Sequence, residues 1–367
     1  MSKTVLHWSY RDYRNVPIDL FLYENLEEVY LKENFITQIP KWLLNLTNLK
    51  FIHLSGNALE ELPDDIYYLE NLEFLDVSNN KITSLPHTIG EMKSLQRLNV
   101  SGNKLTEIPK GIGRLKKLEV LDICANQLTS LPMEMSECSH LNELSMSDNT
   151  QLTYIPERIA NMQSLQFLAA ERCGLLYLPA ALAKFVNRVN IFQNPSITHI
   201  PMIYETFFAS FYDAIQTGMP RNIEHPHFFF VREKANNTKL LLPFGTLEVF
   251  HVPSVENRIT LYDDCLHSLN YLNFFLPLYK NEILLNSLPT KYMGDHIKNG
   301  PIARCTHRNC FNPLYTSYYF MPVKRRNSTS KTIFSCNFCS MYCANLWSKE
   351  NIKKYYSIEW ELCDADD

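Results

Sequence analysis

The sequence predicts an α/β solenoid with the shape of a horseshoe, followed by a small α+β region. The solenoid is predicted by similar units that begin at Leu26, Leu49, Leu72, Leu95, Leu118, Leu141, Leu165 and Val186, with the first six starts spaced 23 residues apart. A fixed period of this length is typical of an array in which each unit packs only against its neighbours. The period is lost after Pro201, and cysteines then crowd beyond residue 300, which indicates a second region.

Each unit repeats one order of apolar and polar residues. Its first, fourth and sixth positions are apolar, as in Leu72, Leu75 and Val77, and should point inward from a short strand. The ninth position is Asn, whose buried amide can satisfy backbone groups, except where Cys173 replaces it. This unit resembles the leucine-rich repeat. A Pro that should fix the backbone on the convex side follows at positions 40, 63, 86, 109, 132, 156, 179 and 201.

The side chains between the leucines should face outward on the concave side, because side chains alternate along a strand. They are the candidates for binding a protein, and Phe51 with Phe74 should be adjacent and should contribute most, since exposed aromatic residues mark interaction sites. The alternative for any one of them is a solvated surface residue. The candidate residues are Tyr30, Phe51, His53, Phe74, Asp76, Arg97, Asp122, Glu143, Phe167, Arg188 and Phe192.

Composition and motifs exclude several classes of function. The net charge of −4 gives no general field for phosphate backbones, so we expect no nucleic acid; the only support for one is the short basic turn Lys324 to Arg326. No Gly-rich phosphate loop, paired nucleophile motif or HExxH occurs, so we expect no enzyme. The N-terminus has no signal-like apolar stretch, and Leu272 to Leu278 is interrupted by Pro277, so we expect no membrane span and a cytoplasmic protein, with the nucleus left open.

A helix is expected to begin at Thr260 in the segment TLYDDCLHSL. Thr260 is a good N-cap, and Leu261, Cys265 and Leu269 share one face at i, i+4 and i+8. The segment resembles the elongin C-binding BC box; the alternative is an ordinary amphipathic helix that packs on its own domain. Downstream, SLPTKYMGDHI with Leu288 and Pro289 resembles a cullin box, although its Lys291 stands where an apolar residue is common, which leaves cullin 2 and cullin 5 both open.

Five cysteines lie between Cys305 and Cys343. Two close pairs separated by an expected hairpin are the spacing of a tetrahedral structural zinc site with four thiolates, for which we assign Cys305, Cys310, Cys339 and Cys343. Cys336 competes with Cys339 or Cys343 for a place in this set, and the alternative is a group of buried thiols.

The order of these parts resembles the family of leucine-rich repeat-containing proteins 28 and 58. The resemblance covers nearly the whole chain and is carried by TLYDDCLHSL, SLPTKY, CTHRNC and CSMYC. It implies a substrate receptor of an elongin B/C-cullin ubiquitin ligase, with catalysis left to the partners and an unknown protein as substrate. The competing hypothesis is an intracellular signalling scaffold without ligase association.

The chain is accordingly expected to have five parts. A degenerate unit from Leu6 to Val16 suggests a cap, and Lys239 to Val252 should form a hairpin around Phe244 and Gly245. The expected parts are an N-terminal cap over 1–25, repeats over 26–208, a junction with a hairpin over 209–258, BC-box-like and cullin-box-like helices over 259–300, and a zinc-binding region over 301–367.

Overall fold

In the computed structural model the chain forms two compact units. The first comprises Met1–Thr153, Asn161–Gly174 and Phe185–Phe192, and the second comprises Tyr154–Ala160, Leu175–Lys184 and Gln193–Asp367. The structure describes residues 4–160, 162–176, 178–179, 182, 186, 188–197, 200–201, 228–233, 239–243, 246–249, 303–307, 310, 313–314, 318–326, 334–338, 341–357 and 360–363.

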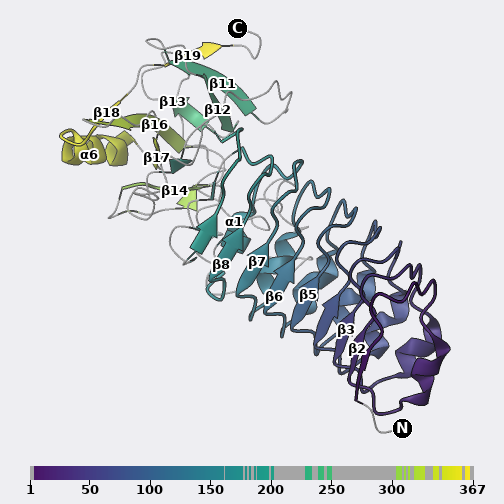
Figure 1. Cartoon of the computed structure of the whole chain (residues 1–367). Coiled ribbons are helices and arrows are strands. Elements are labelled where there is room, and N and C mark those ends of the chain that lie inside the picture. Colours follow the sequence, from purple (N-terminus) through teal and green to yellow (C-terminus); the bar gives the residue numbers. More distant parts are fainter. Residues whose placement is uncertain are drawn as a thin grey trace, which may run out of the picture. The chain divides into compact units, whose positions relative to one another are not determined.

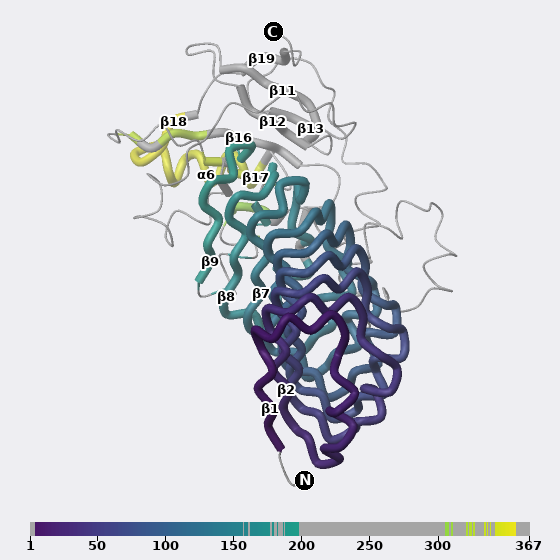
Figure 2. Tube along the Cα trace, turned by 45° about the vertical axis from the view of Figure 1, so that its right-hand side comes forward, coloured from purple at the N-terminus to yellow at the C-terminus, as the bar shows by residue number. Residues whose placement is uncertain are grey.

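The first unit is built on a parallel sheet of nine strands in chain order, which Figures 1 and 2 show running along the solenoid. Every pair of neighbours is in register, so that Phe51 lies opposite Phe74, and Phe74 opposite Arg97. Equal positions of successive repeats are therefore neighbours in space, as the period predicts. The strands are β1 (Val5–His7), β2 (Glu28–Tyr30), β3 (Phe51–His53), β4 (Phe74–Asp76), β5 (Arg97–Asn99), β6 (Val120–Asp122), β7 (Glu143–Ser145), β8 (Phe167–Ala169) and β9 (Arg188–Asn190).

The middle residue of every strand is buried in the solenoid core. Leu75, Leu121 and Leu144 have no exposed surface, and each such side chain stabilises the fold by roughly 1.5–3 kcal/mol. At the N-terminal end β1 extends the sheet, and Leu6 and Leu20 are buried with the repeat leucines.

After each of the strands β1 to β7 the chain turns through a short helix on the opposite side of the repeat. Pro is the N-cap residue of η1 to η6, with φ between −61° and −72°, and its carbonyl accepts a hydrogen bond from the residue three places on. This confirms the predicted role of the Pro residues, because Pro has its φ fixed near this value. The helices are η1 (Ile18–Leu22), η2 (Lys41–Asn45), η3 (Asp64–Tyr68), η4 (His87–Glu91), η5 (Lys110–Arg114), η6 (Met133–Glu137) and α1 (Glu157–Ala160).

The repeated Asn residues connect neighbouring repeats, as predicted. The amide nitrogen of Asn80 donates to the carbonyls of Leu54 and Val77 at 3.0 Å, and its oxygen accepts from the Leu59 amide at 2.9 Å. The residue before each of these Asn positions, and before Cys173 in the repeat that lacks the Asn, has a positive φ. Two of these residues are glycines, which adopt a positive φ without strain. The residues at this left-handed position are Glu33, Gly56, Asn79, Gly102, Ala125, Asp148, Arg172 and Gln193.

Within its described residues, the second unit contains three small sheets and the helices α1 and α6. One sheet has the order β10-β17-β16-β13 with β18 also paired to β16, another has the order β12-β11-β19, and a third pairs β14 with β15. The elements are β10 (Ile200–Pro201), β11 (Phe228–Glu233), β12 (Lys239–Pro243), β13 (Thr246–Val249), β14 (Ala303–Arg304), β15 (Pro313–Leu314), β16 (Tyr318–Arg325), β17 (Phe334–Phe338), β18 (Tyr355–Ser357), β19 (Trp360–Cys363) and α6 (Met341–Asn351).

The predicted hairpin around Phe244 and Gly245 is wrong. Its two strands, β12 and β13, exist, but β12 pairs antiparallel with β11, and β13 pairs parallel with β16. The alternation of apolar residues predicts a strand but not its partner, because any neighbouring edge can complete its hydrogen bonds. The hairpin predicted between the cysteine pairs is confirmed, since β16 and β17 pair antiparallel.

Two further predictions concern membrane spans and the segments that resemble a BC box and a cullin box. Among the helices in the described part of the chain, none is long and apolar enough to cross a membrane. The BC-box-like and cullin-box-like segments, with Thr260, Leu261, Cys265, Leu269, Leu288 and Pro289, lie outside the described residues.

Candidate protein-binding face and thiol cluster

The side chains of β1–β9 that point away from the core form one surface, here called the strand face. Most of the predicted binding residues lie on it. Arg97, Glu143 and Arg188 are exposed there, and Phe192 follows β9 by two residues and is half-buried. Half-buried residues on the strands are Tyr30, Phe51, His53, Phe74, Asp122 and Phe167.

Five rings on β1 to β4 make an aromatic ladder, consisting of His7, Tyr30, His53, Phe51 and Phe74. The ring centroids are 4.4 Å apart for His7 and Tyr30, and 4.2 Å apart for Tyr30 and His53. Those of His53 and Phe74 are 4.7 Å apart, and those of Phe51 and Phe74 are 6.3 Å apart. The predicted adjacency of Phe51 and Phe74 is confirmed. His7 was not among the candidates, although the register of the degenerate first unit places it beside Tyr30.

Asp76 is buried beneath the ladder. Its side chain is 9% exposed; one oxygen, Oδ1, accepts from the hydroxyl of Ser78 at 2.7 Å, and Oδ2 lies 3.8 Å from Nζ of Lys32. Burial alone raises the pKa of the Asp76 carboxyl, but His53, Ser78 and Lys32 together lower it below its ordinary value. The contacts of Asp76 thus lie within the chain, and its contact with a partner stays a prediction.

His53 completes this arrangement. Its Nδ1 is 3.9 Å from Oδ2 of Asp76, which is an ion-pair distance but too long for a hydrogen bond. Within the described residues this buried nitrogen has no hydrogen-bond partner. The imidazole is thus held in place mainly by stacking between Tyr30 and Phe74.

The later repeats carry a second aromatic position with charged neighbours. The guanidinium of Arg188 lies 5.4 Å from the ring centroid of Phe167, which is a cation–π contact. Arg172 donates twice to Asp148, from Nε at 2.6 Å and from a terminal nitrogen at 2.7 Å, and this hydrogen bonding lowers the pKa of the Asp148 carboxyl. Asp148 and Arg172 are adjacent because both occupy the left-handed position of their repeats.

A thiol cluster lies in the second unit. The Sγ atoms of Cys305, Cys310 and Cys343 are all within 4.8 Å of one another, with Cys305 and Cys343 buried. Four thiolates at about 2.3 Å from a zinc ion are roughly 3.8 Å apart, so these three sulfurs can hold a metal after a small contraction. The fourth predicted ligand, Cys339, lies outside the described residues, between β17 and α6.

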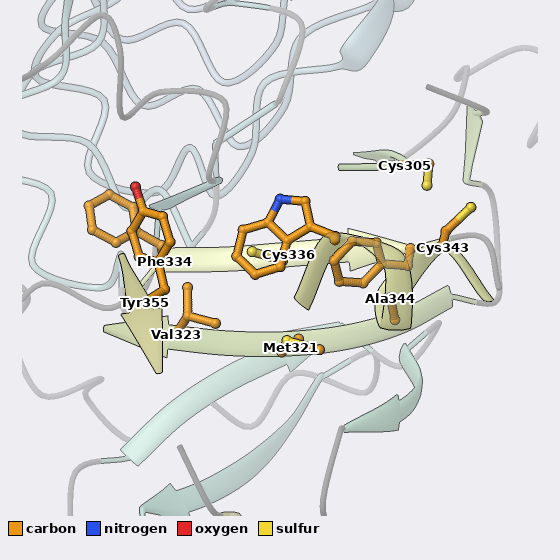
Figure 3. Packing of buried hydrophobic residues seen from close by; sticks show 10 residues of the cluster. Cys305, Met321, Val323, Phe334, Cys336, Cys343, Ala344 and Tyr355 are labelled. Carbon is orange, nitrogen blue, oxygen red and sulfur yellow. The ribbon is translucent and has the colours of Figure 1, made fainter. Parts of the chain in front are cut away.

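Cys336 belongs to the core of the second unit instead. It is fully buried on β17, opposite Met321 on β16, and Figure 3 shows it among aromatic rings, apart from Cys305 and Cys343. The rings of Phe338 and Trp347 are 5.8 Å apart, as are those of Trp347 and Tyr355. The alternation of β17 explains this placement, since Phe334, Cys336 and Phe338 share one buried face.

Among the cysteines of the repeats, Cys138 and Cys173 are buried and Cys124 is half-buried. Burial raises the pKa of the Cys138 thiol to about 12 and that of Cys173 to about 11. Burial also raises the pKa of the Cys124 thiol. All three are therefore neutral thiols at pH 7 and poor metal ligands.

Comparisons with known proteins agree with this fold. Family models match as leucine-rich repeat region over residues 26–105, as two copies of leucine-rich repeats over 93–134, and as leucine-rich repeat over 116–175. Leucine-rich-repeat domains are thus present, and the chain carries a protein-binding domain of this class. No curated protein matches the chain.

Solved structures with similarity to the chain include the ectodomain of a plant membrane receptor kinase and the PEPR1-AtPEP1 structure. The first is GASSHO1/SCHENGEN3 from Arabidopsis thaliana in complex with CASPARIAN STRIP INTEGRITY FACTOR 2. The two sequences are 28% identical, the match covers 49% of this chain and 26% of that chain, and the TM-score is 0.40. The second is the PEPR1-AtPEP1 structure, with 27% sequence identity. The match covers 58% of this chain and 33% of that chain, and the TM-score is 0.49. The chain spans about a third of the length of these structures or less.

Proposed function

We propose that this chain is the substrate receptor of an elongin B/C-cullin ubiquitin ligase. The aromatic ladder supports the protein-binding part of this proposal: its rings pack on one another along neighbouring strands, with His7 exposed and the other four half-buried. Aromatic side chains of this kind lose little conformational entropy when a partner covers them, and they are enriched among binding hot spots.

The ligase part of the proposal rests on one segment that resembles a BC box and another that resembles a cullin box. In this proposal Leu261, Cys265 and Leu269 form the face that contacts elongin C, and Leu288 with Pro289 contacts cullin 2 or cullin 5. The strand face holds the protein to be modified. Ubiquitin transfer is then performed by the partner proteins, and the chain itself is not an enzyme.

Zinc has a structural role in this proposal. Cys305, Cys310, Cys339 and Cys343 are its four thiolate ligands, a closed set that leaves no place for a reacting molecule. The support is the proximity of three of these sulfurs at one end of the core of the second unit. Zinc there would fix the start of α6 against the segment around Cys305.

A scaffold without ligase association is the second candidate. It is favoured by the fact that the strand face accounts for protein binding on its own. The deciding experiment is purification of the tagged full chain from cytoplasmic extract, the compartment that we propose for it, followed by measurement of endogenous elongin C. Stoichiometric elongin C supports the receptor, and its absence leaves the scaffold.

A further inference from the structure

The strand face combines the aromatic ladder with a local excess of carboxylates. Seven carboxylates and three cations occupy the second, third and fifth positions of the eight repeats, where the second position directly precedes each strand and Asp76 is buried. A surface with one prevailing sign attracts partners of the opposite sign and repels those of its own. The carboxylates are Glu27, Glu28, Glu73, Asp76, Glu119, Asp122 and Glu143, and the cations are Lys50, Arg97 and Arg188.

Three of the four carboxylates near the ladder, all except Glu73, have side-chain contacts within the chain. Glu27 pairs with Lys50 at 3.0 Å, and Asp76 lies near Lys32 and His53. Glu28 accepts a hydrogen bond from the hydroxyl of Tyr30 at 3.0 Å. These charges are therefore partly compensated before any partner arrives.

Three carboxylates at β6 and β7, of which Glu119 directly precedes β6, differ in that they lack a cationic partner among the described residues. Glu119, Asp122 and Glu143, here called the acidic stretch, form no ion pair with any Lys, Arg or His in the part of the chain that the structure describes. They are close together, since the amide of Glu143 donates to the carbonyl of Glu119 at 3.0 Å and β6 pairs with β7. Glu143 is exposed, and the other two are half-buried.

The distance between the two features follows from the sheet. Phe74 lies on β4, two strands from β6 and three from β7. Neighbouring strands are about 4.8 Å apart, so the acidic stretch lies roughly 10–14 Å from the ladder. An extended peptide covers this distance in three to four residues.

We propose that the strand face binds a basic segment of its partner protein. An apolar side chain of that segment contacts Phe51 and Phe74, and Lys or Arg side chains three to four residues away pair with the acidic stretch. This inference rests on the proposed function, because it names the chemical class of the protein that the strand face captures.

Desolvation of the carboxylates disfavours a partner segment that makes only apolar contacts with the strand face. A neutral segment laid across β4 to β7 would remove water from three carboxylates that have no cation to replace it, and burying an unpaired charge is costly. An acidic segment would add repulsion to that cost. The acidic stretch thus selects against both kinds of partner and in favour of a basic one.

The test is selection of a random 12-residue phage-displayed peptide library on the immobilised full chain. Enriched peptides are then synthesised and titrated against the unmodified chain and three variants. E119Q/D122N/E143Q removes the acidic stretch, and F51A/F74A removes part of the ladder. E60Q/E61Q/E107Q is the matched control, because it removes as many exposed carboxylates from positions outside the strands.

We expect the enriched peptides to be basic, with an apolar residue three to four positions from a Lys or Arg. Their affinity should fall about tenfold in E119Q/D122N/E143Q, the combined effect of three surface ion pairs of ordinary strength, and should stay unchanged in the control. It should also weaken as salt concentration rises, since these pairs are screened.

Neutral or acidic enriched peptides, no enrichment at all, or an equal loss in the control variant would overturn the proposal. Peptides that respond to F51A/F74A but not to E119Q/D122N/E143Q would also reject the basic class, while leaving the strand face as the binding surface. Elongin C copurification tests the ligase role separately, so the two failures are distinguishable.

Discussion

The imidazole of His53 stacks on the phenol ring of Tyr30, with centroids 4.2 Å apart and planes 10° from parallel. The two residues occupy the same position in successive repeats, and the register of β2 and β3 places them side by side. Since Asp76 occupies that position in the next repeat, a change at one repeat acts on its neighbours.

Replacement D76N should reduce stability at neutral pH and flatten its dependence on acid. The pKa of the Asp76 carboxyl is lower in the folded chain than its ordinary value of about 4. The charged carboxylate therefore stabilises the fold at pH values above this ordinary pKa. This contribution is lost as pH falls through the folded pKa. We expect the free energy of unfolding of D76N to be lower by about 1 kcal/mol at pH 7, with the difference vanishing in acid.

Asn99 shows how an asparagine fits at the position that Asp76 occupies in its repeat. It occupies the equivalent position one repeat later, and its Oδ1 accepts from the amide and hydroxyl of Ser101 at 3.0 and 2.7 Å. An Asn at position 76 can therefore keep the contacts with Ser78, and D76N removes the charge alone. Urea unfolding followed by circular dichroism, in steps from pH 7 into the acid range below the ordinary pKa of Asp, measures the effect; a difference that stays constant over this whole range would contradict it.

Replacement F51A/F74A should weaken capture of the partner protein and leave the fold intact. Both rings are half-buried on the strand face, so their loss removes contact area rather than the core, and hot-spot truncations cost roughly 2 kcal/mol or more. F35A/Y68A is the matched control, because Phe35 and Tyr68 are 57% and 51% exposed and lie outside the strands. The measurement is quantitative capture of the partner with circular dichroism of each variant. Unchanged capture by F51A/F74A would move the contact toward Phe167 and Phe192.

Replacement N126A should destabilise the solenoid by about 3 kcal/mol, because it leaves buried carbonyls without their donor. The Asn126 amide donates to the carbonyls of Val100 and Ile123 at 3.1 Å, and its oxygen accepts from the Leu105 amide. N48A should cost at most about 0.5 kcal/mol, since Asn48 makes one exposed hydrogen bond, to Glu24. Equal midpoints of urea unfolding for the two variants would argue against the amide ladder as a source of stability.

Metal analysis of the purified chain should find about one zinc, the number that four thiolates bind. C343A should lose this zinc and lower the stability of the second unit, because Cys343 lies in the thiol cluster at the start of α6. C336A is the control: it shortens a buried core side chain and should keep the zinc. Zinc lost from C336A but retained by a C339A variant would place Cys336 in the ligand set instead.

How far the sequence predicts this structure depends on whether a feature is local to the repeat. The period places Leu75, Asn80 and Phe74 correctly, because each repeat meets only its neighbours. The surroundings of Asp76 are harder to predict, since they depend on which residues occupy neighbouring repeats: His53 one repeat earlier and Lys32 two repeats earlier. The pairing of β12 and β13 escapes prediction because their partners, β11 and β16, are chosen by contacts distant in sequence.

The last prediction separates receptor from scaffold. If the helix expected at Thr260 is a BC box, Leu261 fills an apolar pocket on elongin C and Cys265 packs in the same groove. The variant L261A/C265A should then abolish copurification of elongin C, because burial of one such leucine contributes roughly 1.5–3 kcal/mol, or about one to two decades of affinity. Zinc content, thermal stability and partner capture should stay unchanged.

If the helix instead packs into its own domain, L261A/C265A creates a buried defect and lowers the melting temperature. F35A/Y68A again serves as a control, since it changes exposed apolar residues of the first unit and should affect neither readout. A surface that docks on a partner is not needed for the stability of the free chain. A lowered melting temperature of L261A/C265A, together with no elongin C bound to the unmodified chain, therefore rejects the receptor hypothesis and leaves the scaffold hypothesis.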